Sequence, residues 1–328
     1  MRWGCVLCAV VLCFAASELT GQDDEFHRLT EQANALEHSG QYAQAFALYR
    51  EALHMAEGRG KRDKDVIGSL NGLAVASIGL GRLPEAERYY GRILALAESA
   101  GLNHGPDYAV LLYNLGALRL EEGRVQDAEK LIRKSAGLMR SEQPDGSLEL
   151  ARMWLGLGVV LLRQNQCGEA EQVLSAAEAI LDKEGQPGRN SLPTALNNLG
   201  MVWRCQKRYA EAEQIFERAI SVYEENFGPD TPTMLRAVVN LAVTFGELGR
   251  ADEAEATFQR ALAIAEKGFG RDHPEYGSAL LVYSRFLRNS GRTKEAKATE
   301  VRSRALLSDS ARRNGVGMTV DASALRPR

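Results

Sequence analysis

The chain has 328 residues, of which 45% are hydrophobic and 25% charged, and its formal net charge is −3. This composition is ordinary for a soluble globular protein and supplies enough apolar side chains for a core. The charge balance has no basic excess, so the sequence predicts no nucleic-acid partner.

The first residues have the three-part form of a secretory signal peptide. Arg2 gives a positive start, residues 3–16 are uncharged and mostly apolar, and Ala15-Ala16-Ser17 is a small-residue cleavage site. The apolar run is too short to cross a bilayer as a permanent helix, which favours cleavage over an uncleaved membrane anchor. We therefore predict a signal peptide over residues 1–17, export to the periplasm or secretion, and no membrane span in the mature chain. A polar lead-in follows at residues 18–25.

An alanine that recurs every 41 or 42 residues organises the rest of the chain. The alanines of this column are Ala45, Ala86, Ala128, Ala170, Ala212, Ala254 and Ala296. A nearly constant period over successive copies is the signature of a repeat array. We predict that the array covers residues 26–308.

Each repeat has two helical halves separated by a turn. In the first half, apolar and small residues recur at helical spacing, as in Leu196, Leu199, Gly200 and Trp203. A glycine within a helix costs roughly 1 kcal/mol relative to alanine, so the small residues of this column predict the close approach of another helix.

The last repeat departs from the pattern. Glu300 stands in the column of Phe258, and Ser303 replaces its small apolar partner. Polar residues there predict an outward-facing terminal cap. Residues 309–328 are rich in Arg and also contain Gly, Asn and Pro, and we predict that they form a disordered tail.

Two repeats carry the residues of a known signature. Trp154-x2-Leu157-Gly158-x2-Leu161 followed by Ala170-x3-Leu174 resembles the tetratricopeptide motif, as does Leu196-x2-Leu199-Gly200-x2-Trp203 followed by Ala212-x3-Phe216. The 42-residue unit, with Asn198-Leu199-Gly200 in its first helix, is similar to the kinesin light chain type. The resemblance implies an all-α fold, a right-handed α-α superhelix of about seven helix-turn-helix repeats. It also implies a concave groove, lined by the first helices, that binds a peptide or helix of a partner. The likeness is one of repeat type, so cargo transport is not carried over.

The sequence shows no set of residues for catalysis. The chain has five histidines, and neither a zinc-type His pair nor a Gly-x-Ser-x-Gly nucleophile motif is present. We therefore predict no enzymatic activity, no cofactor and no metal site. Cys167 and Cys205 could form a disulfide in an exported chain, but the strict geometry of a bridge favours two separate thiols.

The groove is the predicted functional surface. Its candidate residues lie on the first helices outside the packed stripe: Tyr113, Asn114, Arg152, Asn197, Asn198, Met201, Arg204, Arg236, Asn240, Val243 and Arg285. Asn114, Asn198 and Asn240 share one column, where an amide can donate to and accept from a peptide backbone. The alternative is that they bridge adjacent first helices. The arginines could attract an acidic partner or be solvated charges without a function.

These observations predict an exported, non-catalytic scaffold that binds a peptide or an amphipathic helix of a partner protein in its groove. Two alternatives remain at this point. One is a structural element that assembles with copies of itself, and the other is an enzyme that uses groove residues, which the missing catalytic set disfavours. The sequence makes no prediction of the oligomeric state.

Overall fold

The fold is known from a computed structural model that describes residues 23–37, 39–58, 63–144 and 146–314. The predicted signal peptide and the end of the predicted tail, residues 315–328, lie outside the described residues. Within the described ranges, all regular secondary structure is helical. This confirms the all-α class. In those same ranges, none of the helices is both long and apolar enough to cross a membrane.

The helices fall into two compact units, Met1–His104 and Gly105–Arg328. In the first unit, helical residues 23–37 precede α2 (Tyr42–Gly58), α3 (Asp63–Gly79) and α4 (Leu83–Ser99). The second unit contains α5 (Gly105–Glu121), α6 (Val125–Glu142), α7 (Leu148–Arg163), α8 (Cys167–Lys183), α9 (Gly185–Cys205), α10 (Tyr209–Phe227), the 3₁₀ helix η1 (Pro232–Met234), α11 (Leu235–Glu247), α12 (Ala251–Phe269), α13 (Pro274–Asn289) and α14 (Thr293–Asn314).

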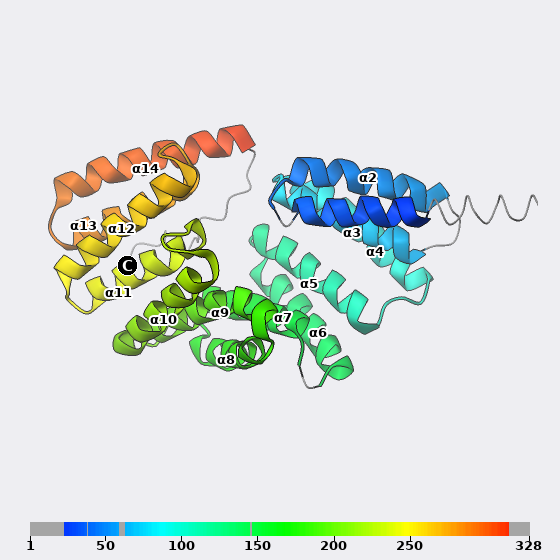
Figure 1. The fold of residues 1–328 in the computed structure, drawn as a ribbon, viewed down its shortest axis with the longest axis horizontal. Helices are drawn as coiled ribbons and strands as arrows, with labels where there is room; N and C mark the ends of the chain where they lie inside the picture. Colours follow the sequence, from blue (N-terminus) through cyan, green and yellow to red (C-terminus); the bar gives the residue numbers. More distant parts are fainter. Residues whose placement is uncertain (1–22, 38, 59–62, 145, 315–328) are drawn as a thin grey trace, which may run out of the picture. The chain divides into compact units, whose positions relative to one another are not determined.

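Helices pair as the repeat pattern predicts. We number the repeats from 1, the pair of helix 23–37 and α2, to 7, the pair α13 and α14. Within the second unit each first helix packs on the second helix of its own repeat, and α5, α7, α9, α11 and α13 also contact one another in order (Figure 1). The first helices of this unit therefore share one layer.

The small-residue column exists because the second helix crosses there. A Cβ atom on Gly200 would lie 2.5 Å from the Phe216 ring, and one on Gly158 would lie 2.5 Å from Leu174. Ala254 of the alanine column is fully buried as well. Close packing of this kind leaves no room for an added methyl group. The predicted helix crossing is confirmed.

The turn within each repeat needs a left-handed backbone. Gly249 has φ +76° and Gly291 has φ +77°, a region that glycine adopts without a steric penalty. In repeats 4 and 5 the equivalent residues are Asn165 with φ 60° and Lys207 with φ 62°. Asparagine tolerates this conformation better than lysine does.

Both predicted ends of the array need correction. Helical structure already begins at residue 23, inside the predicted lead-in 18–25. At the other end α14 continues to Asn314, beyond the predicted boundary at 308. The expected outward face is also wrong for Ser303, which is fully buried and donates a hydrogen bond of 2.7 Å to the carbonyl of Gly277. Ser303 therefore ties α14 to α13.

Candidate functional site

The predicted groove residues lie on the five first helices of the second unit, α5, α7, α9, α11 and α13. Seven of them lie on the adjacent first helices α9 and α11, and one of the seven, Arg204, is held in a pair with Glu247. We call the other six the α9–α11 face: Asn197, Asn198, Met201, Arg236, Asn240 and Val243. The helices that carry them contact each other directly, and the repeat period places equivalent positions side by side.

An amide bridge joins the two helices of this face. Asn240 donates its Nδ2–H to Oδ1 of Asn197 at 2.9 Å, and the Asn197 amide lies 3.4 Å from Oδ1 of Asn198. Asn197 and Asn198 are each only 7% exposed. Asn240 of the predicted column therefore does bridge α11 to α9, but its partner is Asn197, which lies next to the column residue Asn198. The bridge uses one N–H of Asn240, while an amide also has a second N–H and an acceptor oxygen.

Tyr113 does not line an open groove. A Cβ atom on Gly156 would lie 2.7 Å from Cε2 of Tyr113, so the tyrosine ring occupies the space over the backbone of α7. The guanidinium of Arg152 lies 5.4 Å from the ring centroid, within reach of a cation–π contact. Burial raises the pKa of the Tyr113 hydroxyl. Gly156 also interrupts the asparagine column between Asn114 and the α9–α11 face.

The predicted arginines divide by their partners. Arg204 forms a bidentate pair with Glu247, with Nε to Oε2 at 2.9 Å and Nη2 to Oε1 at 3.1 Å. A bidentate pair of this kind fixes the guanidinium. Arg285 is half-buried on α13 and has its own interactions. Arg236 is exposed at the start of α11, one helical turn before Asn240.

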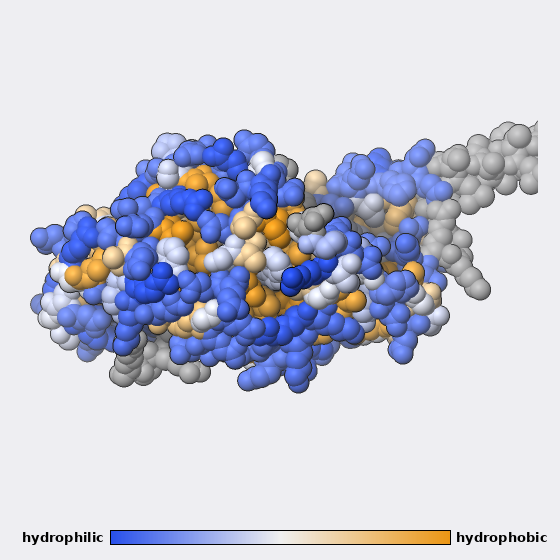
Figure 2. Space-filling view, turned by 90° about the horizontal axis from the view of Figure 1, so that it is seen from below, coloured by the Kyte–Doolittle hydropathy of each residue, from blue (hydrophilic) through white to orange (hydrophobic). Residues whose placement is uncertain are grey.

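The apolar part of the face is partly covered. Met201 and Val243 are half-buried and pack against the core clusters below them. On the side of the molecule that Figure 2 shows, apolar side chains gather in patches bordered by hydrophilic ones. Exposed apolar atoms are normal on protein surfaces, so surface hydropathy by itself does not mark a binding site.

Sequence reasoning missed a set of arginines in the turns. Arg250 donates to Glu253 in its own repeat at 2.6 Å and to Glu213 of the preceding repeat at 2.7 Å. Arg208 and Arg292 make the same two kinds of bond one repeat earlier and one repeat later. The signal was present in the sequence, because these arginines and their acceptors recur at the repeat period. These clamps hold successive repeats together at the turns.

The clamps also lower acidic pKa values. The hydrogen bond from Arg250 holds the pKa of Glu253 below its usual value. Glu295 is affected in the same way by Arg292. A hydrogen bond to the charged form favours ionisation, so these carboxylates stay charged to lower pH in the folded state.

The two cysteines are joined rather than separate. Cys167 at the start of α8 and Cys205 at the end of α9 form a disulfide, and their Cα atoms are 6.2 Å apart. The expectation of two separate thiols is therefore wrong. The expectation failed because repeats 4 and 5 stack, which brings the start of α8 close to the end of α9. The number of residues between the two cysteines does not reveal this proximity.

Clusters for metal binding are missing from the part of the chain that the structure describes. No group of three His, Cys, Asp or Glu side chains there could hold a metal ion. The residues of the α9–α11 face carry amides, a thioether, one aliphatic side chain and one exposed guanidinium. Such groups bind by hydrogen bonding, ion pairing and apolar contact.

Paired helices of fixed period, stacked so that their first helices share a layer, define the class of helical-repeat solenoid proteins. A family model of the tetratricopeptide repeat matches residues 65–141, 107–183, 191–267 and 233–309. The chain belongs to the tetratricopeptide repeat family.

Solved structures agree in fold. A Rap protein complexed with competence and sporulation factor aligns with a TM-score of 0.69 and 16% identity, over 87% of this chain and 78% of that one. NprR in complex with its cognate peptide NprX aligns with a TM-score of 0.60 and 13% identity, over 87% and 80%. Kinesin light chain repeats of Podosopora anserina align with a TM-score of 0.51 and 19% identity, over 63% and 98%. At these identities the similarity shows the fold alone. No curated protein matches the chain.

Proposed function

We propose that this chain is an exported, non-catalytic scaffold that binds a segment of a partner protein on the α9–α11 face. The observation that carries the proposal is the amide bridge between Asn240 and Asn197, with exposed Arg236 one turn away. The bridge holds Asn240 in place before a ligand arrives, which lowers the entropic cost of binding.

The chemistry of the face indicates the kind of segment. The second N–H and the oxygen of Asn240 suit a peptide backbone, which needs both a donor and an acceptor. Arg236 suits a carboxylate, and the half-buried Met201 and Val243 suit an apolar side chain. We therefore expect a partner segment that combines acidic and apolar residues.

Two structures similar in fold support a peptide-binding role. The Rap protein is complexed with competence and sporulation factor, and NprR with its cognate peptide NprX. Both share only the fold with this chain, and repeat folds of this kind serve many functions. The proposal that the partner binds on the α9–α11 face therefore rests on the contacts within this chain and not on the similar structures.

A crosslinking experiment tests the face. A photo-crosslinking amino acid is placed at Met201 and, as a matched control, at Gln259 on α12, and partners are captured from the native envelope fraction. We expect a crosslinked partner from position 201 that disappears when Arg236→Ala and Asn240→Ala are combined. Equal crosslinking from both positions, or a partner that survives the double substitution, would show that this face is not the site.

The proposed export has support from the cysteines. The disulfide between Cys167 and Cys205 suits an oxidising compartment, because thiols are kept reduced in the cytosol. We expect the chain from its native source to begin after Ser17 and to contain no thiol that reacts without prior reduction. Intact mass with and without alkylation measures both. A mature chain that starts at Met1 with two reactive thiols in the repeats would contradict export.

Self-assembly through the last repeat is disfavoured by charge. Glu171, Glu213 and Glu255 each accept a bond from the turn arginine of the following repeat. The equivalent residue of repeat 7 is Lys297, so the last repeat has no carboxylate to accept such a bond from a stacked copy. Light scattering over a dilution series should therefore show no growth of open-ended polymers.

A further inference from the structure

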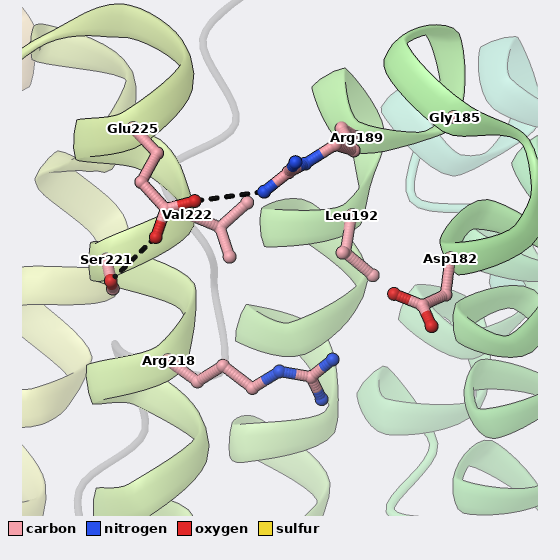
Figure 3. A pocket seen from close by; sticks show the side chains of 8 residues that line it. All are labelled: Asp182, Gly185, Arg189, Leu192, Arg218, Ser221, Val222 and Glu225. Carbon is pink, nitrogen blue, oxygen red and sulfur yellow. Dashed lines mark hydrogen bonds and ion pairs between the residues drawn. The ribbon is translucent and has the colours of Figure 1, made fainter.

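A cavity lies where α8, α9 and α10 meet, at the junction between repeats 4 and 5 (Figure 3). Its volume is about 560 Å³, within the range of small-molecule sites. Asp182 lines it from the end of α8, Leu192 from α9, and Arg218 and Val222 from α10. The cavity is built by residues other than those of the α9–α11 face.

The charges in this cavity are only partly paired. Arg189 donates to Glu225 at 2.9 Å, and one N–H of Arg218 donates to Glu178 at 2.6 Å. Among the residues that the structure describes, none forms a hydrogen bond or ion pair with Asp182, and Glu178 is the one acceptor of Arg218. Figure 3 shows the Asp182 carboxylate and the Arg218 guanidinium reaching toward the same space from opposite sides, with Leu192 between them.

At the next two junctions, the residues equivalent to Arg218 and Asp182 have charged partners. Between repeats 5 and 6, Arg260 is the equivalent of Arg218 and donates to Glu224, the equivalent of Asp182. The linker there adds Asp230, which also accepts from Arg260 at 3.1 Å. Between repeats 6 and 7, Glu266 is the equivalent of Asp182, and the linker supplies Arg271 at 2.7 Å. In one junction the linker thus provides an anion, and in the other a cation.

Between repeats 4 and 5, the positions equivalent to Asp230 and Arg271 hold Gly188 and Pro187, so neither charge is present at those positions. Helix α8 ends at Lys183 and α9 begins at Gly185, so hardly any linker exists. Gly188 stands at the position equivalent to Asp230, and a Cβ atom there would lie 2.1 Å from the carbonyl oxygen of Leu181. No side chain fits at that position. The chain itself therefore cannot supply the missing groups from there.

We propose that this cavity binds a free α-amino acid with an aliphatic side chain. A zwitterion supplies both missing groups: its carboxylate accepts from the remaining N–H groups of Arg218, and its ammonium donates to Asp182. Leu192 is 4% exposed and Val222 9%, and they form an apolar floor for the aliphatic side chain. The proposal does not depend on the function proposed for the α9–α11 face.

Calorimetric titration of the mature chain with leucine tests the proposal. The two comparison ligands are isocaproate, which keeps the carboxylate but has no ammonium, and isoamylamine, which keeps the ammonium but has no carboxylate. We expect leucine to bind at least about tenfold more tightly than either, because each analogue leaves one charged group of the cavity unpaired. No heat of binding at millimolar leucine, or equal affinity for all three ligands, would overturn the proposal.

Substitutions locate the site. Asp182→Asn and Arg218→Gln should each weaken leucine binding at least about tenfold, while Glu178→Gln, which leaves Arg218 in place, should not weaken it. Arg260→Gln is the matched control at the junction that its own linker fills. All four residues are exposed or half-buried, and circular dichroism checks that each variant is folded. Leucine binding that survives Asp182→Asn, or that is lost equally in Arg260→Gln, would exclude this cavity.

Discussion

The junction between repeats 4 and 5 differs from the junction between repeats 5 and 6, although one sequence period builds both. The later junction has a glycine turn at Gly249 and a linker whose Asp230 pairs with Arg260. The earlier one is flanked by non-glycine turns at Asn165 and Lys207 and has a disulfide on one edge and a cavity on another.

The comparison shows that the repeat fixes its buried residues but allows the surface residues of a junction to vary. Repeats 5 and 6 keep the same packed centre, in which Phe216 and Phe258 are almost completely buried. The surface of the junction varies, because exposed residues are not constrained by packing. A repeat protein of this kind can therefore place a crosslink or a ligand site at one junction without changing the fold.

The largest effect should come from the shared centre. Phe216→Ala and Phe258→Ala each remove a buried ring, and we expect each to lower the free energy of unfolding by about 3–5 kcal/mol. The two losses should be similar because both rings pack against a first helix in the same register. Urea denaturation followed by circular dichroism measures them. A loss confined to one repeat would mean that the two centres are not equivalent.

The disulfide should give the next largest effect. Cys167 and Cys205 are separated by 38 residues, and a crosslink of this kind stabilises by roughly 2–4 kcal/mol, mainly by restricting the unfolded chain. We expect Cys167→Ser combined with Cys205→Ser to lower the melting temperature, and a reductant to do the same to the wild type. The reductant should not affect the double variant. An unchanged melting temperature would show that this junction gains no stability from the bond.

The sequence predicted the fold well because the fold depends on a periodic pattern. The alanine column, the small residue at Gly200 and the ring of Phe216 identified the helix pairs and their crossing. It did not predict the ends of the array. Helix α14 continues to Asn314, although the apolar pattern stops earlier.

The candidate site was predicted less well than the fold. The sequence placed Asn198 and Asn240 on adjacent first helices, which is correct, but it left open whether they bridge and did not identify Asn197 as the partner of Asn240. It could not show that the Tyr113 ring covers Gly156 or that Arg204 pairs with Glu247. These outcomes depend on side-chain directions between repeats, which a period in the sequence does not specify.

The turns offer a finer comparison. Gly249→Ala places a side chain in the left-handed region and should cost about 1–2 kcal/mol. Lys207→Gly at the equivalent turn removes that strain but gives the unfolded chain more freedom, so its net effect should be within about 1 kcal/mol of zero. Thermal unfolding of both variants measures the difference. A similar loss for both would show that the turn of repeat 5 carries no backbone strain.

The smallest effect should come from the turn arginines. Repeat 4 has Gln166 at the position of Arg250, and Gln166 bonds to its neighbour Gln164 at 3.0 Å instead of clamping the repeats. Arg250→Gln therefore makes the turn of repeat 6 resemble that of repeat 4. We expect a lower melting temperature than in the wild type, with a smaller change than the loss of the disulfide, because these groups are exposed and screened by salt.

The pH dependence of this loss distinguishes a clamp from a mere change of side chain. Arg250 lowers the pKa of Glu253 in the folded state, so the stability that this pair contributes is present above the unfolded pKa of a glutamate, about 4.3. It is lost as the pH falls through the lower folded pKa. The difference in melting temperature between wild type and Arg250→Gln should therefore be constant near neutral pH and shrink below about pH 4. A difference that persists at low pH would mean that Arg250 acts through the packing of its aliphatic stem rather than through its charge.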